Sequence, residues 1–156
     1  MQADRGSSGP AISAGGRFVV YSSLASGGDT NDGWDVFLHD RRTGSTERVS
    51  VNSRGRQGGG QSQGPGFWGE SASVSRDGRF VVFSSTASNL SPEIDDAVVN
   101  VYVRDGGDLT TTALSLTPEG RGADGDSGGV RVSADGSTVA FASAASNLVE
   151  DDVNGH

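Results

Sequence analysis

The sequence contains no cysteine, which excludes disulfide bonds, thiolate metal sites and a cysteine nucleophile. It also contains no lysine, so all 12 basic side chains are arginines, and 20 acidic side chains outnumber them. The resulting net charge of -8 repels a phosphate backbone, and we therefore expect no nucleic-acid partner. No apolar run approaches the roughly 20 residues that a helix needs to cross a bilayer, so we expect no membrane insertion.

Apolar residues make up only 33% of the chain, which is little for a protein that must bury a core by itself. We therefore expect stability to depend on packing between neighbouring modules. The chain has 25 glycines and 4 prolines, a composition that suits short strands joined by tight turns better than helices, where glycine is unfavourable.

One sequence pattern occurs three times along the chain. Residues 11–23 read AISAGGRFVVYSS, residues 73–85 read SVSRDGRFVVFSS, and residues 131–143 read RVSADGSTVAFAS. Repeats of this length indicate a modular fold in which each unit buries its apolar surface against the next unit.

A second module follows the first two copies of this pattern. Residues 35–40 (DVFLHD) match residues 100–105 (NVYVRD), whereas the third copy stops short of this module. The sequence therefore predicts a first repeat at residues 1–67, a second at residues 68–127 and a partial third at residues 128–156.

Each copy of the pattern predicts a tight β-hairpin. Asp77-Gly78 and Asp135-Gly136 lie between β-branched and aromatic residues, and Asp-Gly favours hairpin turns because both residues tolerate a positive φ. Gly15-Gly16 can form the same turn in the first copy.

The strand that follows each turn is apolar on both faces. In the first copy Phe18 and Val20 point to one face, while Val19 and Tyr21 point to the other. Such a strand is expected to be covered on two sides, and because the sequence contains no amphipathic helix, other sheets must cover it.

Small sheets that stack face to face around an axis form a β-propeller. Further turns at residues 41–44 and 106–108 give four strands in each complete repeat. A parallel β-solenoid is the alternative, but its repeats are usually shorter and do not contain two tight hairpins each. The predicted fold is therefore all-β, with four-stranded antiparallel blades in an incomplete propeller.

The repeated motifs resemble the TolB-like propeller repeats of bacterial proteins. The pattern is Ser-x-Asp-Gly-Arg-Phe-Val-Val-Phe-Ser-Ser, followed by Ala-Ser-Asn-Leu and then by Asp-Val-Phe-x-x-Asp, and it covers nearly the whole chain. The resemblance implies a propeller and a periplasmic or secreted location. It implies little about activity, because the family includes periplasmic scaffolds as well as propeller domains attached to peptidases.

An acidic loop in the first repeat is a candidate metal site. It contains the four possible calcium ligands Asp29, Asn31, Asp32 and Asp35 close to Gly33. Calcium takes six to eight oxygen ligands, and closely spaced carboxylate and amide oxygens can supply several of them. The loop is not an EF-hand, and the alternative interpretation is a solvated surface loop that keeps the protein soluble.

The sequence predicts no catalytic residue. His39 corresponds to Arg104 in the second repeat, and a general base is not expected at a position whose chemistry changes between repeats. The Gly-x-Ser-x-Gly pattern at residues 60–64 and 125–129 lacks the strand-to-helix turn of a nucleophile elbow. Trp34 and Trp68 lie in predicted loops, where each can stack on a ligand or cover the end of a blade.

These observations favour a non-catalytic binding or scaffold module that recognises a protein, peptide or glycan through its loops, with calcium as a possible stabilising ion. The alternatives are an accessory domain of a larger hydrolase or peptidase whose catalytic residues lie outside this chain, and a purely structural repeat. Unpaired strand edges at both ends of the repeats also predict self-association or pairing with the remaining blades of a longer chain.

Overall fold

The computed structural model describes residues 5–24, 29–62, 72–95 and 98–149, and these residues form ten β-strands and no helix. The strands are β1 (Ser7–Ile12), β2 (Phe18–Ser23), β3 (Asp35–Asp40), β4 (Ser45–Arg48), β5 (Ala72–Val74), β6 (Phe80–Ser85), β7 (Asn100–Asp105), β8 (Thr110–Ala113), β9 (Ser127–Val132) and β10 (Val139–Ser143). The predicted all-β class is confirmed.

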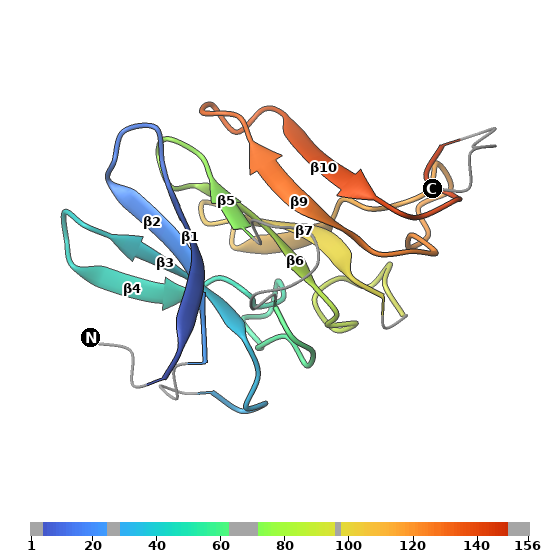
Figure 1. The fold of residues 1–156 in the computed structure, drawn as a ribbon, viewed down its shortest axis with the longest axis horizontal. Coiled ribbons are helices and arrows are strands. Elements are labelled where there is room, and N and C mark those ends of the chain that lie inside the picture. The colour runs from blue at the N-terminus through green and yellow to red at the C-terminus, as the bar shows by residue number, and fades with distance from the viewer. Residues whose placement is uncertain (1–4, 25–28, 63–71, 96–97, 150–156) are drawn as a thin grey trace.

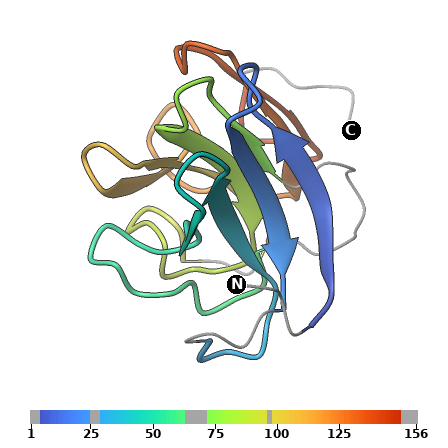
Figure 2. The ribbon, with the colours of Figure 1, turned by 90° about the vertical axis from the view of Figure 1, so that its left-hand side faces the viewer.

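The strands form three antiparallel sheets that follow one another along the molecule (Figure 1). Two sheets have four strands each in chain order, β1-β2-β3-β4 and β5-β6-β7-β8, and the third pairs β9 with β10. A view along the stack shows the first sheet in front of the other two (Figure 2). Each sheet lies in one predicted repeat, apart from Ser127 at the start of β9, and the exact repeat boundaries stay a prediction.

The predicted hairpin turns are present between the first two strands of each sheet. Gly16, Gly78 and Gly136 have φ angles of 70°, 79° and 77°, which a residue with a side chain rarely adopts. The turn between the third and fourth strands needs the same conformation, and Gly44 provides it with a φ of 75°. In the second sheet Leu109 stands at this position with a φ of 56°, so a residue other than glycine takes the positive φ there.

Burial of both faces is confirmed for the central strand of the second sheet. In β6, Val81 and Phe83 are buried against the first sheet, and Val82 is buried against the third. In β2 only one face is covered, because Val19 and Tyr21 are half-buried and no described sheet packs on their side.

Two apolar clusters hold the sheets together. The cluster between the first and second sheets consists mainly of Phe18, Val20, Val36, Leu38, Val49, Ala72, Val74, Val81, Phe83, Leu90, Ile94 and Tyr102. The cluster between the second and third sheets is smaller and consists of Val82, Val101 and Val130 with half-buried neighbours that include Val103, Leu114, Val132, Val139 and Phe141. The core therefore lies between sheets, as the low apolar content predicts.

A ring-on-glycine contact recurs at both interfaces. A Cβ atom added to Gly78 would lie 2.7 Å from atoms of the Phe18 ring, and one added to Gly136 would lie 2.2 Å from the Phe80 ring. Each ring thus packs directly on the hairpin turn of the next sheet, where glycine is required by its φ angle and by the close approach. The third sheet has the exposed Thr138 where the other two have this phenylalanine.

An arginine–aspartate pair fixes the end of the hairpins in the first two sheets. Arg17 donates two hydrogen bonds to Asp40, at 2.9 and 2.6 Å, and Arg79 donates two to Asp105, both at 2.8 Å. The third sheet has Ser137 in place of this arginine.

No stretch of the described chain forms a helix with the length and apolar character needed to traverse a lipid bilayer.

Candidate functional site

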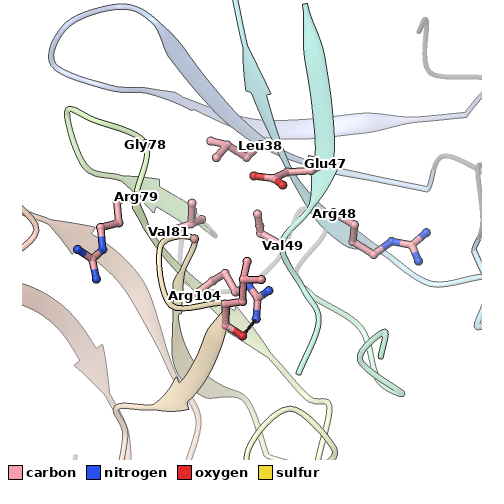
Figure 3. Close-up of a pocket in the computed structure, with 10 residues that line it drawn as sticks. Leu38, Glu47, Arg48, Val49, Gly78, Arg79, Val81 and Arg104 are labelled. Atoms are coloured by element: carbon pink, nitrogen blue, oxygen red, sulfur yellow. Dashed lines mark hydrogen bonds between the residues drawn. The ribbon is translucent and has the colours of Figure 1, made fainter. Parts of the chain in front are cut away.

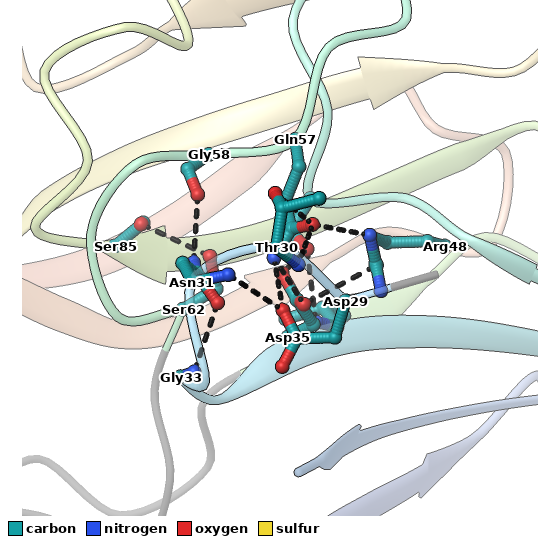
Figure 4. Close-up of polar contacts among 12 residues, drawn as sticks. Asp29, Thr30, Asn31, Gly33, Asp35, Arg48, Gln57, Gly58, Ser62 and Ser85 are labelled. Carbon is teal, nitrogen blue, oxygen red and sulfur yellow. Dashed lines mark hydrogen bonds and ion pairs between the residues drawn. The ribbon is translucent and has the colours of Figure 1, made fainter. Parts of the chain in front are cut away.

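A buried carboxylate is the centre of a polar network in the first sheet (Figure 4). Asp35 is 1% exposed at the start of β3. It accepts hydrogen bonds from the Ser50 hydroxyl at 2.7 Å and from the Gln57 side-chain amide at 2.9 Å, and it pairs with Arg48 Nε at 3.2 Å. Burial raises the pKa of Asp35, although the Ser50 hydrogen bond and the Arg48 charge oppose this change.

Gln57 joins Asp35 to the acidic loop. Its amide nitrogen also donates to Asp29 at 2.6 Å, and its carbonyl oxygen accepts from Arg48 Nη1 at 2.6 Å and from the Thr30 amide and hydroxyl at 3.1 and 3.0 Å. Burial alone would raise the pKa of Asp29, but the hydrogen bonds from Gln57 and Asn31 lower it overall. One amide side chain therefore connects two carboxylates, an arginine and a loop threonine.

The other two predicted calcium ligands make separate contacts. Asn31 donates from its side-chain nitrogen to the carbonyl oxygens of Gly58 and Gly60 at 2.8 and 3.1 Å, so it ties the acidic loop to the segment that leaves the first sheet. Asp32 has a φ of 51°, and its carboxylate is exposed and lies 3.3 Å from Arg5.

The structure thus brings Asp29 and Asp35 together through Gln57, while Asn31 and Asp32 face other partners. In the residues that the structure describes, no group of three or more acidic, histidine or cysteine side chains is arranged to hold a metal ion. Calcium binding by this loop stays a prediction.

Trp34 and His39 have local partners. The Trp34 ring lies against Gly6, with its Cη2 atom 3.7 Å from the position of a Cβ on that glycine, and Trp68 lies outside the described residues. Nδ1 of His39 lies 2.8 Å from the Thr46 hydroxyl across β3 and β4. Ligand binding by Trp34 and Trp68 therefore stays a prediction.

Comparison with solved structures decides the architecture. The crystal structure of TolB from Acinetobacter baumannii matches with a TM-score of 0.53 and 19% sequence identity, over 89% of this chain and 27% of the TolB chain. The fold is that of a β-propeller. This chain spans about a quarter of the length of the TolB structure, so its blades form an incomplete propeller. No protein-family model matches the chain, and no curated protein matches it.

The network around Asp35 is specific to the first blade, and the sequence analysis identified Asp35 but missed Gln57, which connects it to Asp29 and Arg48. In both complete blades a serine that follows the fourth strand bonds the first two residues of the third strand. Ser50 bonds Asp35 and Val36 at 2.7 and 3.1 Å, and Ser115 bonds Asn100 and Val101 at 2.7 and 3.0 Å. The second blade therefore has the serine bridge with a neutral Asn100 in place of the carboxylate.

Three positions change together between these blades. The first blade has Asp35, Arg48 and Gln57 where the second has the uncharged set Asn100, Ala113 and Gly122. A carboxylate, a cation and an amide that appear together in one repeat indicate a shared contact, because a buried charge needs partners. This signal was available in the sequence.

A small cavity lies between the first and second blades (Figure 3). Its lining includes Leu38, Val49, Val81 and Arg104, and its volume of about 30 Å³ is room for a water molecule. Arg104 is buried and donates from Nη1 to the carbonyl oxygen of Leu109 at 2.8 Å. This cavity is far smaller than the several hundred Å³ of a typical small-molecule site.

Proposed function

We propose that this chain is a non-catalytic binding or scaffold module that recognises a protein, peptide or glycan through the loops of its blades. The observation that carries the proposal is that side chains able to do chemistry make structural contacts within the blade. Asp35, Arg48 and Gln57 bond one another, and His39 bonds Thr46. Such contacts stabilise a rigid recognition surface, and rigidity favours binding because less motion is lost when a ligand is bound.

A repeated asparagine clamp supports this interpretation. Asn89 donates to the carbonyl oxygen of Gln57 at 3.0 Å and accepts from the Gly59 amide at 2.7 Å. In the next blade, Asn147 donates to the carbonyl oxygen of Gly122 at 3.2 Å and accepts from the Asp124 amide at 3.0 Å. The asparagine of each Ala-Ser-Asn-Leu motif therefore holds the connection that arrives from the preceding blade.

The clamps order the loops at one end of the blades, and we propose that this end forms the recognition surface. A periplasmic or secreted location is part of the same proposal and rests on the resemblance to TolB-like repeats. Fractionation of cells that express the protein would test the location.

Binding can be tested with the full chain, biotinylated and screened against a glycan array and a displayed peptide library. We expect a selective ligand whose binding is weakened in Asn89→Ala, because this change releases the loop at Gln57 and Gly59. Ser88→Ala is the matched control, since Ser88 is exposed and lies beside Asn89. The proposal would be overturned by an absence of selective ligands, or by hydrolysis of chromogenic ester or peptide substrates that a single substitution abolishes.

A further inference from the structure

The hairpin turns of the second and third sheets each bind an aspartate of their own. Asp77 accepts hydrogen bonds from the Ser75 hydroxyl at 2.6 Å and from the Arg79 amide at 3.0 Å. The third sheet repeats this arrangement around Asp135, which accepts from the hydroxyl two residues earlier at 2.5 Å and from the amide two residues later at 3.1 Å. A serine hydroxyl and a backbone amide therefore bind one carboxylate in each of these turns.

The hairpin turn of the first sheet, residues 13–17, has both donors and no carboxylate. Gly15 stands where the other two turns have aspartate. Ser13 is only 3% exposed, and its hydroxyl oxygen accepts from the Phe18 amide at 3.1 Å. Within the described residues, neither the Ser13 hydroxyl nor the Arg17 amide donates to an acceptor. Because buried hydroxyl groups usually have such a partner, this turn can take an acceptor from another molecule.

The place that aspartate occupies in the other turns is open in the first turn. Among the described residues, a Cβ atom added to Gly15 would meet only Cγ of Arg76, at 3.9 Å, and Gly15 does not have a positive φ. Asp77 occupies this place in the second sheet and is exposed, although a sheet packs on each side of that sheet. The place is therefore accessible even within a stack of blades.

The turns of the first blade are basic in a chain that is acidic overall. Residues 13–17 and 40–44 contain three arginines and one aspartate, a net charge of +2, whereas the whole chain carries -8. The corresponding residues of the second blade, 75–79 and 105–109, contain two arginines and three aspartates. The positive charge at the turns of the first blade favours a negatively charged partner.

Two arginines from different blades border the first turn. Arg41 donates from Nη1 to the carbonyl oxygen of Gly16 at 2.7 Å. Arg76 approaches from the second sheet, whose turn lies beside the first turn in both views of the fold (Figure 1, Figure 2). Both arginines are exposed, and neither pairs with a carboxylate of the described residues. Their charges can therefore pair with acidic groups of a partner.

The equivalent turns show that these donors favour a charged carboxylate. Hydrogen bonds from the Ser75 hydroxyl and the Arg79 amide lower the pKa of Asp77. The hydroxyl and amide donors of the third turn lower the pKa of Asp135 to about 2. Arginine adds to this preference, because its guanidinium matches the geometry of a carboxylate.

We propose that the first turn binds an acidic protein segment. One Asp or Glu carboxylate of the segment accepts from the Ser13 hydroxyl and the Arg17 amide, and further acidic side chains pair with Arg41 and Arg76. The site lies at the end of the blades opposite to the asparagine clamps, because the hairpin turn precedes the second strand of a sheet and the clamp asparagine follows it. It is therefore separate from the recognition surface proposed above.

The test follows the backbone amides of the isotope-labelled full chain by nuclear magnetic resonance during titration with a synthetic hexa-aspartate peptide. The Arg17 amide should shift saturably, because it gains a carboxylate acceptor. The Arg79 and Ser137 amides are internal controls, since Asp77 and Asp135 already bind them, and they should not shift.

Substitutions at Gly15 test the same donors. Gly15→Asp supplies a carboxylate from the chain itself and should weaken peptide binding by about tenfold, the value of one hydrogen bond to a charged group. Gly15→Asn places a neutral oxygen on the same donors and should also weaken binding, which separates occupation of the site from the added charge. Gly15→Ala leaves both donors in place and should keep the affinity within about twofold of the wild type.

The inference is overturned if the Arg17 amide does not shift, or if Gly15→Asp and Gly15→Asn bind the peptide as tightly as Gly15→Ala. It is also overturned if acetate or inorganic phosphate shifts the Arg17 amide at concentrations as low as the peptide does, because the site would then take a free anion. Asn89→Ala should leave this titration unchanged, since it alters the opposite end of the blades. Failure of this site and failure of the proposed recognition surface are therefore distinguishable.

Discussion

Replacing Gly78 by alanine should destabilise the protein because the hairpin turn of the second sheet lies directly under the Phe18 ring. The φ of Gly78 is 79°, and a side chain in this left-handed conformation costs about 1–2 kcal/mol. The added Cβ would also lie 2.7 Å from the ring of Phe18, which is 8% exposed and has little room to move. Overpacking of this kind costs about 1–3 kcal/mol, so the free energy of unfolding should fall by about 2–5 kcal/mol.

Two other glycines separate the packing effect from the backbone effect. Gly16 and Gly44 have φ angles of 70° and 75°, and an added Cβ at either would meet no atom within 4 Å. Gly16→Ala and Gly44→Ala should therefore cost the backbone strain alone. The difference of about 1–3 kcal/mol from Gly78→Ala measures the contact with the ring.

Urea denaturation followed by circular dichroism gives these free energies for all three variants. Combining Gly78→Ala with Phe18→Leu should cost less than the sum of the single changes, because a smaller side chain leaves room for the new methyl group. If Gly78→Ala and Gly16→Ala destabilise the protein equally, the first two sheets do not pack as described.

Four further predictions follow from individual residues. Leu109→Gly should be more stable than Leu109→Ala by about 1 kcal/mol in thermal unfolding, because Leu109 has a φ of 56°; the opposite order would show that the turn relaxes in solution. Gln57→Leu should lower the free energy of unfolding by about 1–3 kcal/mol, because Asp29, Asp35 and Arg48 lose a shared partner. The control Gln61→Leu changes an exposed residue and should have little effect, and equal losses in the two variants would contradict the network. Hydrogen bonds from Arg17 and Arg79 hold the pKa values of Asp40 and Asp105 well below the usual carboxyl value of about 4, so the stability that these two carboxylates contribute is present above that pH and is lost as the pH falls through the lowered pKa values. Urea unfolding between pH 5 and pH 2 should show this loss of stability, and the loss should be smaller in Asp105→Asn. Millimolar calcium should raise the melting temperature of the wild type and not of Asp29→Asn if the loop binds the ion, and an unchanged wild type would end the calcium hypothesis.

The repeated motifs predicted the fold because they specify local backbone geometry and burial. The Asp-Gly turns required a positive φ at Gly78 and Gly136, and both glycines have it. Strands that are apolar on both faces predicted a sheet on each side, and β6 has both, whereas β2 is covered on one face only. These features depend on residues close together in the chain, so the sequence pattern contains them directly.

The polar contacts between distant residues were harder to predict. Gln57 follows β4 in the chain and contacts Asp29 and Asp35, which precede that strand, so its role depends on the path of the segment after β4. Leu109 takes a positive φ because the pairing of β7 with β8 requires a tight turn whatever residue is there. The register of strand pairing and the path of a loop depend on contacts between residues far apart in the chain, and residue type alone does not determine them.

Ser137-Thr138 stand in the third sheet where the first two sheets have Arg-Phe. The first two blades each place a phenylalanine ring on the glycine of the next turn, but the third blade offers a hydroxyl and a methyl group there. A blade packed on that side would gain less buried apolar area. A ring of such blades would therefore open first at this seam under heat or denaturant, while the contacts on Gly78 and Gly136 persist.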